Sequence, residues 1–130
     1  MKRVVLLLTS ILVVMSLIVG CSKSADNSNT IKLGVNYELS GNVATYGRSS
    51  VEGIELAIKE INKAGGIDGK EIELVKYDNK SDVAEATTLT TKLITQDKVL
   101  AVMGPATSGA FKGTIPVAMQ NKVPVASGSA

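Results

Sequence analysis

The sequence contains no histidine and no tryptophan, and aromatic residues make up only 3% of its 130 residues. Without histidine there is no imidazole metal ligand, no His-based catalytic triad and no use of the commonest general base. A nucleic-acid stacking platform or an aromatic sugar cage is equally disfavoured, because each needs several exposed rings. These absences argue against a metal site and against most hydrolytic enzymes.

An excess of charge of one sign is also missing from most of the chain. Two of the 14 basic residues, Lys2 and Arg3, precede the first apolar run, and all 12 acidic residues follow Cys21. Beyond Cys21, 12 basic side chains therefore balance 12 acidic ones. We expect no basic surface for DNA, RNA or acidic lipid, and no nucleic-acid partner.

The first 20 residues have the pattern of a signal peptide. Residues 4–19 are apolar except for three hydroxyl residues, and they follow Lys2 and Arg3. This run is shorter than the roughly 20 apolar residues of a membrane-spanning helix. Residues 17–21, LIVGC, resemble the lipobox of bacterial lipoproteins, which implies cleavage after Gly20 and lipidation of Cys21. The alternative is an uncleaved signal anchor in which Cys21 is a free buried thiol.

Cys21 is the only cysteine, so an exported domain made from this chain folds without disulfide bonds. Residues 22–30, SKSADNSNT, are polar and have no apolar anchor. Residues 21–30 are therefore predicted to form a lipidated N-terminus and a flexible tether.

The remainder alternates between strand-like and helix-like segments. Strands are predicted at 31–36, 71–77, 99–103 and 123–126, with helices between them. Asp82 followed three residues later by Glu85 is typical of a capping box. This order predicts an α/β fold with a doubly wound parallel sheet. The last strand has no helix after it, which favours the beginning of a larger protein.

The segment 99–111, VLAVMGPATSGAF, is the clearest candidate for a binding site. An apolar run with the pattern of a strand buried on both faces is broken by Gly104 and Pro105, and a helical pattern follows. Ser108 is predicted to cap that helix, with its hydroxyl and the unpaired N–H groups of the first turn facing the crevice at the carboxyl end of the strand. Such a place favours an anion. The alternative is an ordinary capped turn with no ligand.

Several short blocks together carry a family resemblance: 31–35, 39–41, 46–47, 53–57, 61–70, 78–79 with Ala84, 104–108 and 123–127. The block at 61–70, INKAGGIDGK, is the most specific of them. With these blocks the chain resembles the solute-binding proteins of branched-chain amino-acid ABC transporters, the type I periplasmic-binding-protein family. The resemblance makes residues 31–130 the N-terminal part of the first lobe of a two-lobed, ligand-binding protein, incomplete in this chain.

The resemblance also implies roles for particular residues. The residue matching Ser108 binds the ligand carboxylate through its hydroxyl and N–H, the turn matching Ser129 and Ala130 meets the α-amino group, and the aromatic ring matching Tyr46 packs near the ligand side chain. Each of these residues also has a purely structural alternative, with Tyr46 as a helix-entry staple and Ser129 as a loop serine. Gly128 stands where the family often has proline. The predicted ligand-binding residues are Tyr46, Ala106, Thr107, Ser108, Ser129 and Ala130.

The function implied is a lipid-anchored binding protein on the extracytoplasmic face of the membrane, which delivers an amino acid to ABC permease subunits. An enzyme is disfavoured, because the chain lacks the G-x-G-x-x-G and G-x-x-x-x-G-K-[ST] motifs and offers no base to activate Ser108. No cofactor or metal is expected. The alternative from another class is the ligand-binding sensor domain of a membrane receptor.

Overall fold

A computed structural model of the chain describes residues 29–130. The predicted signal peptide, Cys21 and most of the predicted tether lie outside the described residues. None of the helices between residues 29 and 130 is both long and apolar enough to span a bilayer.

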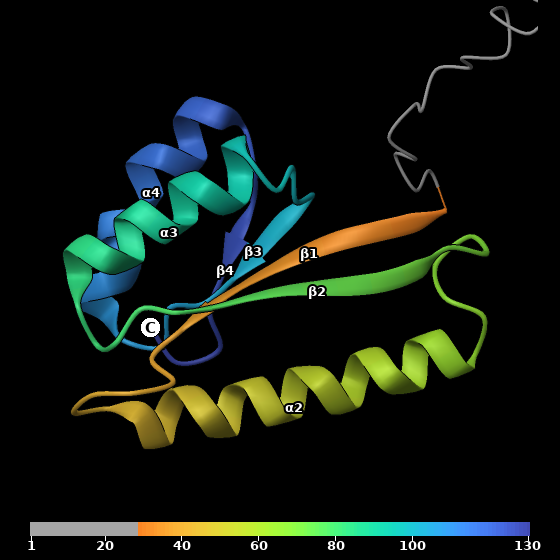
Figure 1. Ribbon diagram of the computed structural model, residues 1–130, viewed down its shortest axis with the longest axis horizontal. Helices are drawn as coiled ribbons and strands as arrows, with labels where there is room; N and C mark the ends of the chain where they lie inside the picture. The colour runs from red at the N-terminus through yellow and green to blue at the C-terminus, as the bar shows by residue number, and fades with distance from the viewer. Residues whose placement is uncertain (1–28) are drawn as a thin grey trace, which may run out of the picture.

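Strands and helices alternate throughout the described part of the chain. In order they are β1 (Thr30–Tyr37), α2 (Ala44–Lys63), β2 (Glu71–Asp78), α3 (Val83–Thr95), β3 (Ala101–Met103), α4 (Ser108–Asn121) and β4 (Val125–Ala126). The strands form one parallel sheet in the order β2-β1-β3-β4. Helix α2 lies on one face of this sheet, and α3 and α4 lie on the other (Figure 1). The predicted doubly wound parallel sheet is confirmed.

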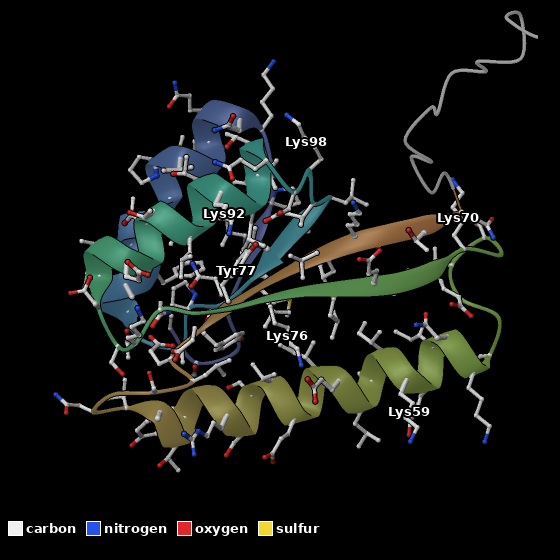
Figure 2. All side chains as sticks on the ribbon, viewed as in Figure 1. Lys59, Lys70, Lys76, Tyr77, Lys92 and Lys98 are labelled. Carbon is white, nitrogen blue, oxygen red and sulfur yellow. The ribbon has the colours of Figure 1, made fainter. Side chains whose placement is uncertain are left out.

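The two faces of the sheet follow from the alternation of side chains along each strand. On β1, Val35 and Tyr37 are buried in the cluster that contains Val51 of α2. On the opposite face, Asn36 bonds to α3. Figure 2 shows the same alternation on β2, where Lys76 points toward α2 and pairs with its Glu55, while the next residue points toward α3.

A second apolar cluster fills the other face of the sheet. Leu93 and Ile94 of α3 pack with Val99 and Val102, and partly buried residues of β2, α4 and β4 surround them. Lys92 of α3 lies over the ring of Tyr77, with its Nζ 4.3 Å from the ring centroid (Figure 2). The core is therefore split into two layers by the sheet, as a doubly wound fold requires.

Several boundaries differ from those expected from the sequence. β1 begins at Thr30, the last residue of the predicted tether. β3 is only three residues long, and Leu100 just before it is 67% exposed, so the expectation of a strand buried on both faces is wrong at this end. The register between β1 and β3 covers only Leu33–Val35, and before Ala101 the pairing continues only as one bond of 2.9 Å from the Leu100 N–H to the Lys32 carbonyl.

The N-cap predicted for α3 is confirmed, whereas the reciprocal half of the capping box is not formed, because the Asp82 N–H donates to the Asn79 carbonyl at 2.9 Å. Asp82 is the N-cap of α3 and its side chain accepts a hydrogen bond of 2.7 Å from the backbone N–H of Glu85. Removal of such a cap typically costs about 1 kcal/mol.

A buried polar network joins the end of β1 to α3. Asn36 Nδ2 donates to the carbonyl of Ala86 at 2.7 Å and to the Thr90 hydroxyl at 2.9 Å. Its Oδ1 accepts a bond of 3.2 Å from Asn79. All three polar side chains, those of Asn36, Asn79 and Thr90, are fully buried. The network fixes the orientation of α3 relative to the central strand at the end of the sheet where the loops converge.

The turn between α2 and β2 lies at the opposite end of the sheet. There the side chain of Asn62 bonds to both backbone groups of Ile72, at 2.9 Å to its carbonyl and 2.8 Å from its N–H. Ile67 and Lys70 close the turn with a pair of backbone bonds. Most of the family-specific block at 61–70 therefore forms a structural turn remote from the carboxyl ends of the strands.

Candidate functional site

Three loops meet where the strands end. The chain leaves β1, β3 and β4 at their carboxyl ends, and α2 and α4 begin beside them (Figure 1). In an open parallel sheet this is the edge at which ligands bind. The predicted site residues all belong to these loops or to the first turns of the two helices.

The loop after β1 is held by Asp78 at the end of β2. Its Oδ1 accepts bonds from the backbone N–H of Leu39 at 2.9 Å and of Ser40 at 3.0 Å, and its Oδ2 accepts from the Ser40 hydroxyl at 2.6 Å. Partial burial opposes ionisation, but these bonds and one from the Lys80 N–H outweigh it and lower the pKa of Asp78. The ionised form thus fastens the β1–α2 loop to β2.

Glu38, the first residue after β1, is fully buried. Its Oε2 accepts from the N–H of Ala106 at 2.9 Å. Its Oε1 accepts from the N–H of Thr107 at 3.2 Å and from the Thr107 hydroxyl at 2.8 Å. Burial, and next the Glu38 charge, raise the pKa of the neighbouring Tyr37. One carboxylate thus joins the loop after β1 to the turn after β3.

Close backbone approach brings α2 to the same place. A Cβ on Gly47 would lie 2.1 Å from the Glu38 carbonyl oxygen, so only glycine lets the first turns of α2 pack against this loop. Tyr46, the preceding residue, is consequently held beside the loops. Its side chain is 67% exposed, which does not fit the alternative of a buried helix-entry staple.

The turn after β3 is set by Gly104 and by the start of α4. Gly104 has a φ of 92° and its N–H donates to the Ala126 carbonyl of β4 at 2.7 Å. The prediction that Ser108 caps α4 is wrong, because the N-cap is Thr107 and Ser108 is the first helical residue. The Thr107 hydroxyl donates to Glu38 and makes no capping bond to the helix.

Three N–H groups of the first turn of α4 remain available. Those of Ser108, Gly109 and Ala110 have no acceptor within residues 29–130, whereas the N–H of Phe111 bonds to the Thr107 carbonyl at 2.9 Å. The Ser108 side chain is exposed. A helix start with free N–H groups favours an anionic group, so a hydroxyl and up to three N–H donors are present for a carboxylate.

A hollow of about 300 Å³ opens over these groups. It is lined by Val43, Tyr46, Ala106, Thr107, Ser108 and Ser129. Ser129 reaches it because its hydroxyl donates to the Ala106 carbonyl at 2.9 Å. The structure therefore brings together five of the six predicted residues. Ala130 does not line the hollow, and its N–H bonds to the Ser127 hydroxyl at 3.2 Å.

Two residues of the site were not predicted from the sequence. Val43 lines the hollow beside Tyr46, and Glu38 holds two of the lining residues from beneath. The one available signal was an acidic residue directly after an apolar strand, which is unusual at a buried position.

A larger hollow, of about 440 Å³, lies between α4 and β4. Its lining is apolar except for Lys122 and includes Met119, whose side chain is 74% exposed. None of the predicted site residues lines it. Because it offers no converging polar groups to orient an amino acid, the smaller hollow is the better candidate for the ligand site.

Residues 30–130 match a family model described as periplasmic binding protein. A curated relative, Leu/Ile/Val-binding protein homolog 7 of Brucella abortus, is 37% identical over 89 residues, which is 66% of this chain and 21% of the relative. The Leu/Ile/Val-binding protein of Escherichia coli is 34% identical over 93 residues. The alignments thus span about a fifth to a quarter of the length of these relatives.

The solved structures that resemble this chain are also binding proteins of transporters. The branched-chain amino acid transporter substrate binding protein LivJ from Streptococcus pneumoniae, in complex with isoleucine, is 55% identical with a TM-score of 0.77, covering 78% of this chain and 29% of that one. A solute binding protein of an ABC transporter from R. palustris, in complex with benzoate, is 31% identical with a TM-score of 0.70, covering 78% and 28%.

Proposed function

Because the chain belongs to the periplasmic binding protein family, we propose that it forms the first part of an extracytoplasmic binding protein. In this proposal the complete protein captures a branched-chain amino acid and delivers it to the permease subunits of an ABC importer. The family consists of solute-binding proteins, and the ligand is held and released without a change in its covalent bonds.

The observation that carries the proposal is the start of α4. Ser108 and the free N–H groups of the first turn adjoin a hollow that is also lined by Tyr46 and Val43. A carboxylate at the helix start and an aliphatic side chain against Tyr46 and Val43 suit an amino acid of the branched-chain kind. The 55% identity to the isoleucine-bound Streptococcus pneumoniae protein supports the same ligand class.

The α-amino group is assigned to the loop after β4. The hydroxyl of Ser129 already donates to the Ala106 carbonyl, so its oxygen is left as an acceptor toward the hollow. The Ala130 segment continues that loop, and we retain it as a site for the ammonium although it does not line the hollow. A second lobe would close over the remaining side of the ligand.

We expect Ser108→Ala in the full-length protein to weaken isoleucine binding by about 1–3 kcal/mol, which is roughly 5- to 150-fold in Kd. The substitution removes one hydroxyl donor while the N–H groups remain, so binding weakens but persists. Isothermal titration calorimetry measures the change.

Ser49→Ala is the matched control, since Ser49 is an exposed serine of α2 that does not line the hollow. Its affinity should equal that of the wild type. Unchanged affinity in Ser108→Ala would return Ser108 to a purely structural position in the first helical turn, and absence of isoleucine binding by the wild type would overturn the proposed function.

We also propose that the mature protein begins at Cys21 and is held at the membrane by lipid on that residue. The support is the sequence pattern of residues 1–21, which lie outside the described residues. Acyl chains contribute about 0.8 kcal/mol per buried CH₂, and two or three chains hold a soluble domain at a bilayer.

Cys21→Ala is therefore expected to move the protein from the membrane fraction to the soluble fraction, or to leave the signal peptide uncleaved. Fractionation and intact-mass measurement distinguish these results. A wild-type protein that is cleaved elsewhere and carries an unmodified Cys21 would contradict the proposal.

The receptor alternative has no support from the relatives described above. They are named as binding proteins or as transporter components.

A further inference from the structure

A buried carboxylate binds the backbone of two residues that line the binding hollow. Glu38 is fully buried, and it bonds to Ala106 and Thr107, both of which line the hollow. Its two oxygens face two N–H groups and one hydroxyl, which is the arrangement that an acceptor-only carboxylate satisfies. Glu38 does not line the hollow, so it acts on a ligand only through the residues that it holds and through its charge.

This charge occupies part of the anion site that the start of α4 would otherwise provide. The N–H groups of Ala106 and Thr107 point to Glu38, and only those of Ser108, Gly109 and Ala110 remain for a ligand. Thr107, which donates its N–H and hydroxyl to Glu38, is the neighbour of Ser108 in the chain. A ligand carboxylate bound at Ser108 would therefore lie close to the Glu38 carboxylate. Like charges at such a separation repel, and the repulsion is stronger in a site that excludes water.

A zwitterionic ligand escapes this penalty. Its ammonium is attracted by the same buried charge that repels its carboxylate, whereas a simple carboxylate feels only the repulsion. Resting on the proposed function, we propose that Glu38 is a specificity-determining residue that makes this site select zwitterionic amino acids over carboxylate anions of the same shape.

Two of the similar solved structures differ in whether their ligand carries an ammonium group. The Streptococcus pneumoniae structure holds isoleucine, a zwitterion, and the R. palustris structure holds benzoate, an anion without an ammonium group. Other charged groups flank the loop that carries Glu38. Arg48 Nε donates to the Leu39 carbonyl at 2.8 Å from an exposed position, and Asp78 fastens Leu39 and Ser40. These groups are the same in every variant below, so they cancel in the comparison.

The test compares two ligands of nearly equal shape in the full-length protein. Isoleucine and 3-methylpentanoate, which is isoleucine without the amino group, are titrated into the wild type and into Glu38→Gln. The anion is measured by competition against isoleucine so that weak binding is still quantified. The quantity of interest is the ratio of the two dissociation constants.

Glu38→Gln should narrow the preference for isoleucine over 3-methylpentanoate by roughly threefold to tenfold, the scale of one charge acting across about 10 Å at an effective dielectric constant between that of a protein surface and that of water. Loosening of the loops around Glu38 would weaken the binding of both ligands together and leave the ratio of their dissociation constants unchanged. Ser40→Ala is the control for such loosening, because it removes a bond of 2.6 Å from the Ser40 hydroxyl to Asp78 in the loop that carries Glu38, keeps the Glu38 charge and lies outside the hollow. Its ratio should equal that of the wild type.

Glu38→Met is the second variant, needed if Glu38→Gln does not fold, since methionine has a similar length and no charge. It is expected to narrow the ratio in the same direction. An unchanged or widened ratio in the folded neutral variant overturns the role of Glu38 while leaving the proposed function intact. Failure of the wild type to bind isoleucine overturns both.

Discussion

Gly104→Ala is expected to destabilise the lobe by about 3–5 kcal/mol and to abolish measurable ligand binding at room temperature. Gly104 has a φ of 92°, in the left-handed region where a side chain is strained. A Cβ there would lie 2.2 Å from the Asn36 carbonyl oxygen and 2.7 Å from two ring carbons of Tyr37. The turn cannot move away alone, because it carries the residues that Glu38 holds. Urea denaturation followed by circular dichroism measures the loss.

Gly53→Ala is the matched control. Gly53 lies in the middle of α2, and a Cβ there would meet nothing within 4 Å. Alanine at an exposed helical position should stabilise the protein by about 0.5–1 kcal/mol. If both substitutions gave the same small change, the packing of the turn after β3 against β1 would not be as described.

Asn36→Ala is expected to lower the free energy of unfolding by about 2–4 kcal/mol. The substitution removes three hydrogen bonds in a fully buried network and leaves the Asn79 amide and the Thr90 hydroxyl without the partner they have in the wild type. Most of the loss comes from polar groups that are left buried and unpaired, because leaving such a group unpaired costs more free energy than a hydrogen bond contributes on balance. The same denaturation measurement applies.

Asn42→Ala provides the comparison for Asn36, because Asn42 lies exposed in the β1–α2 loop. Its unfolding free energy should change by less than about 0.5 kcal/mol. A similarly small change in Asn36→Ala would mean that water or a rearranged Asn79 satisfies the buried groups.

The fold could be predicted from the sequence because its signals are local. Strand and helix patterns alternate within a few residues, and Asp82 and Glu85 mark one helix start by their spacing alone. The position of the site at the strand ends follows from the parallel topology. Topology accounts for the Ser108 region, whereas Tyr46 and Ser129 were predicted only from the family resemblance; in the structure both line one hollow with Ser108.

The role of Glu38 was not predictable in this way. Its partners are 68 and 69 residues away along the chain, and no local pattern connects them. The same long-range contact explains the error at α4. Thr107 and Ser108 are adjacent hydroxyl residues, and either suits an N-cap by sequence, but Glu38 binds the Thr107 hydroxyl and backbone at the N-cap position. The short length of β3 is likewise set by a long-range contact, its register of three pairs with β1, which no local pattern shows.

The turn between α2 and β2 is stabilised by residues that take no part in the hollow. Asn62 clamps Ile72, and Ile67 pairs with Lys70, at the end of the sheet away from the hollow. These bonds do not involve any residue that lines the hollow. Substitutions in the loops at the other end of the sheet therefore leave this turn intact. The block INKAGGIDGK therefore identifies the architecture of the protein, whereas the candidate ligand site lies at the other end of the sheet.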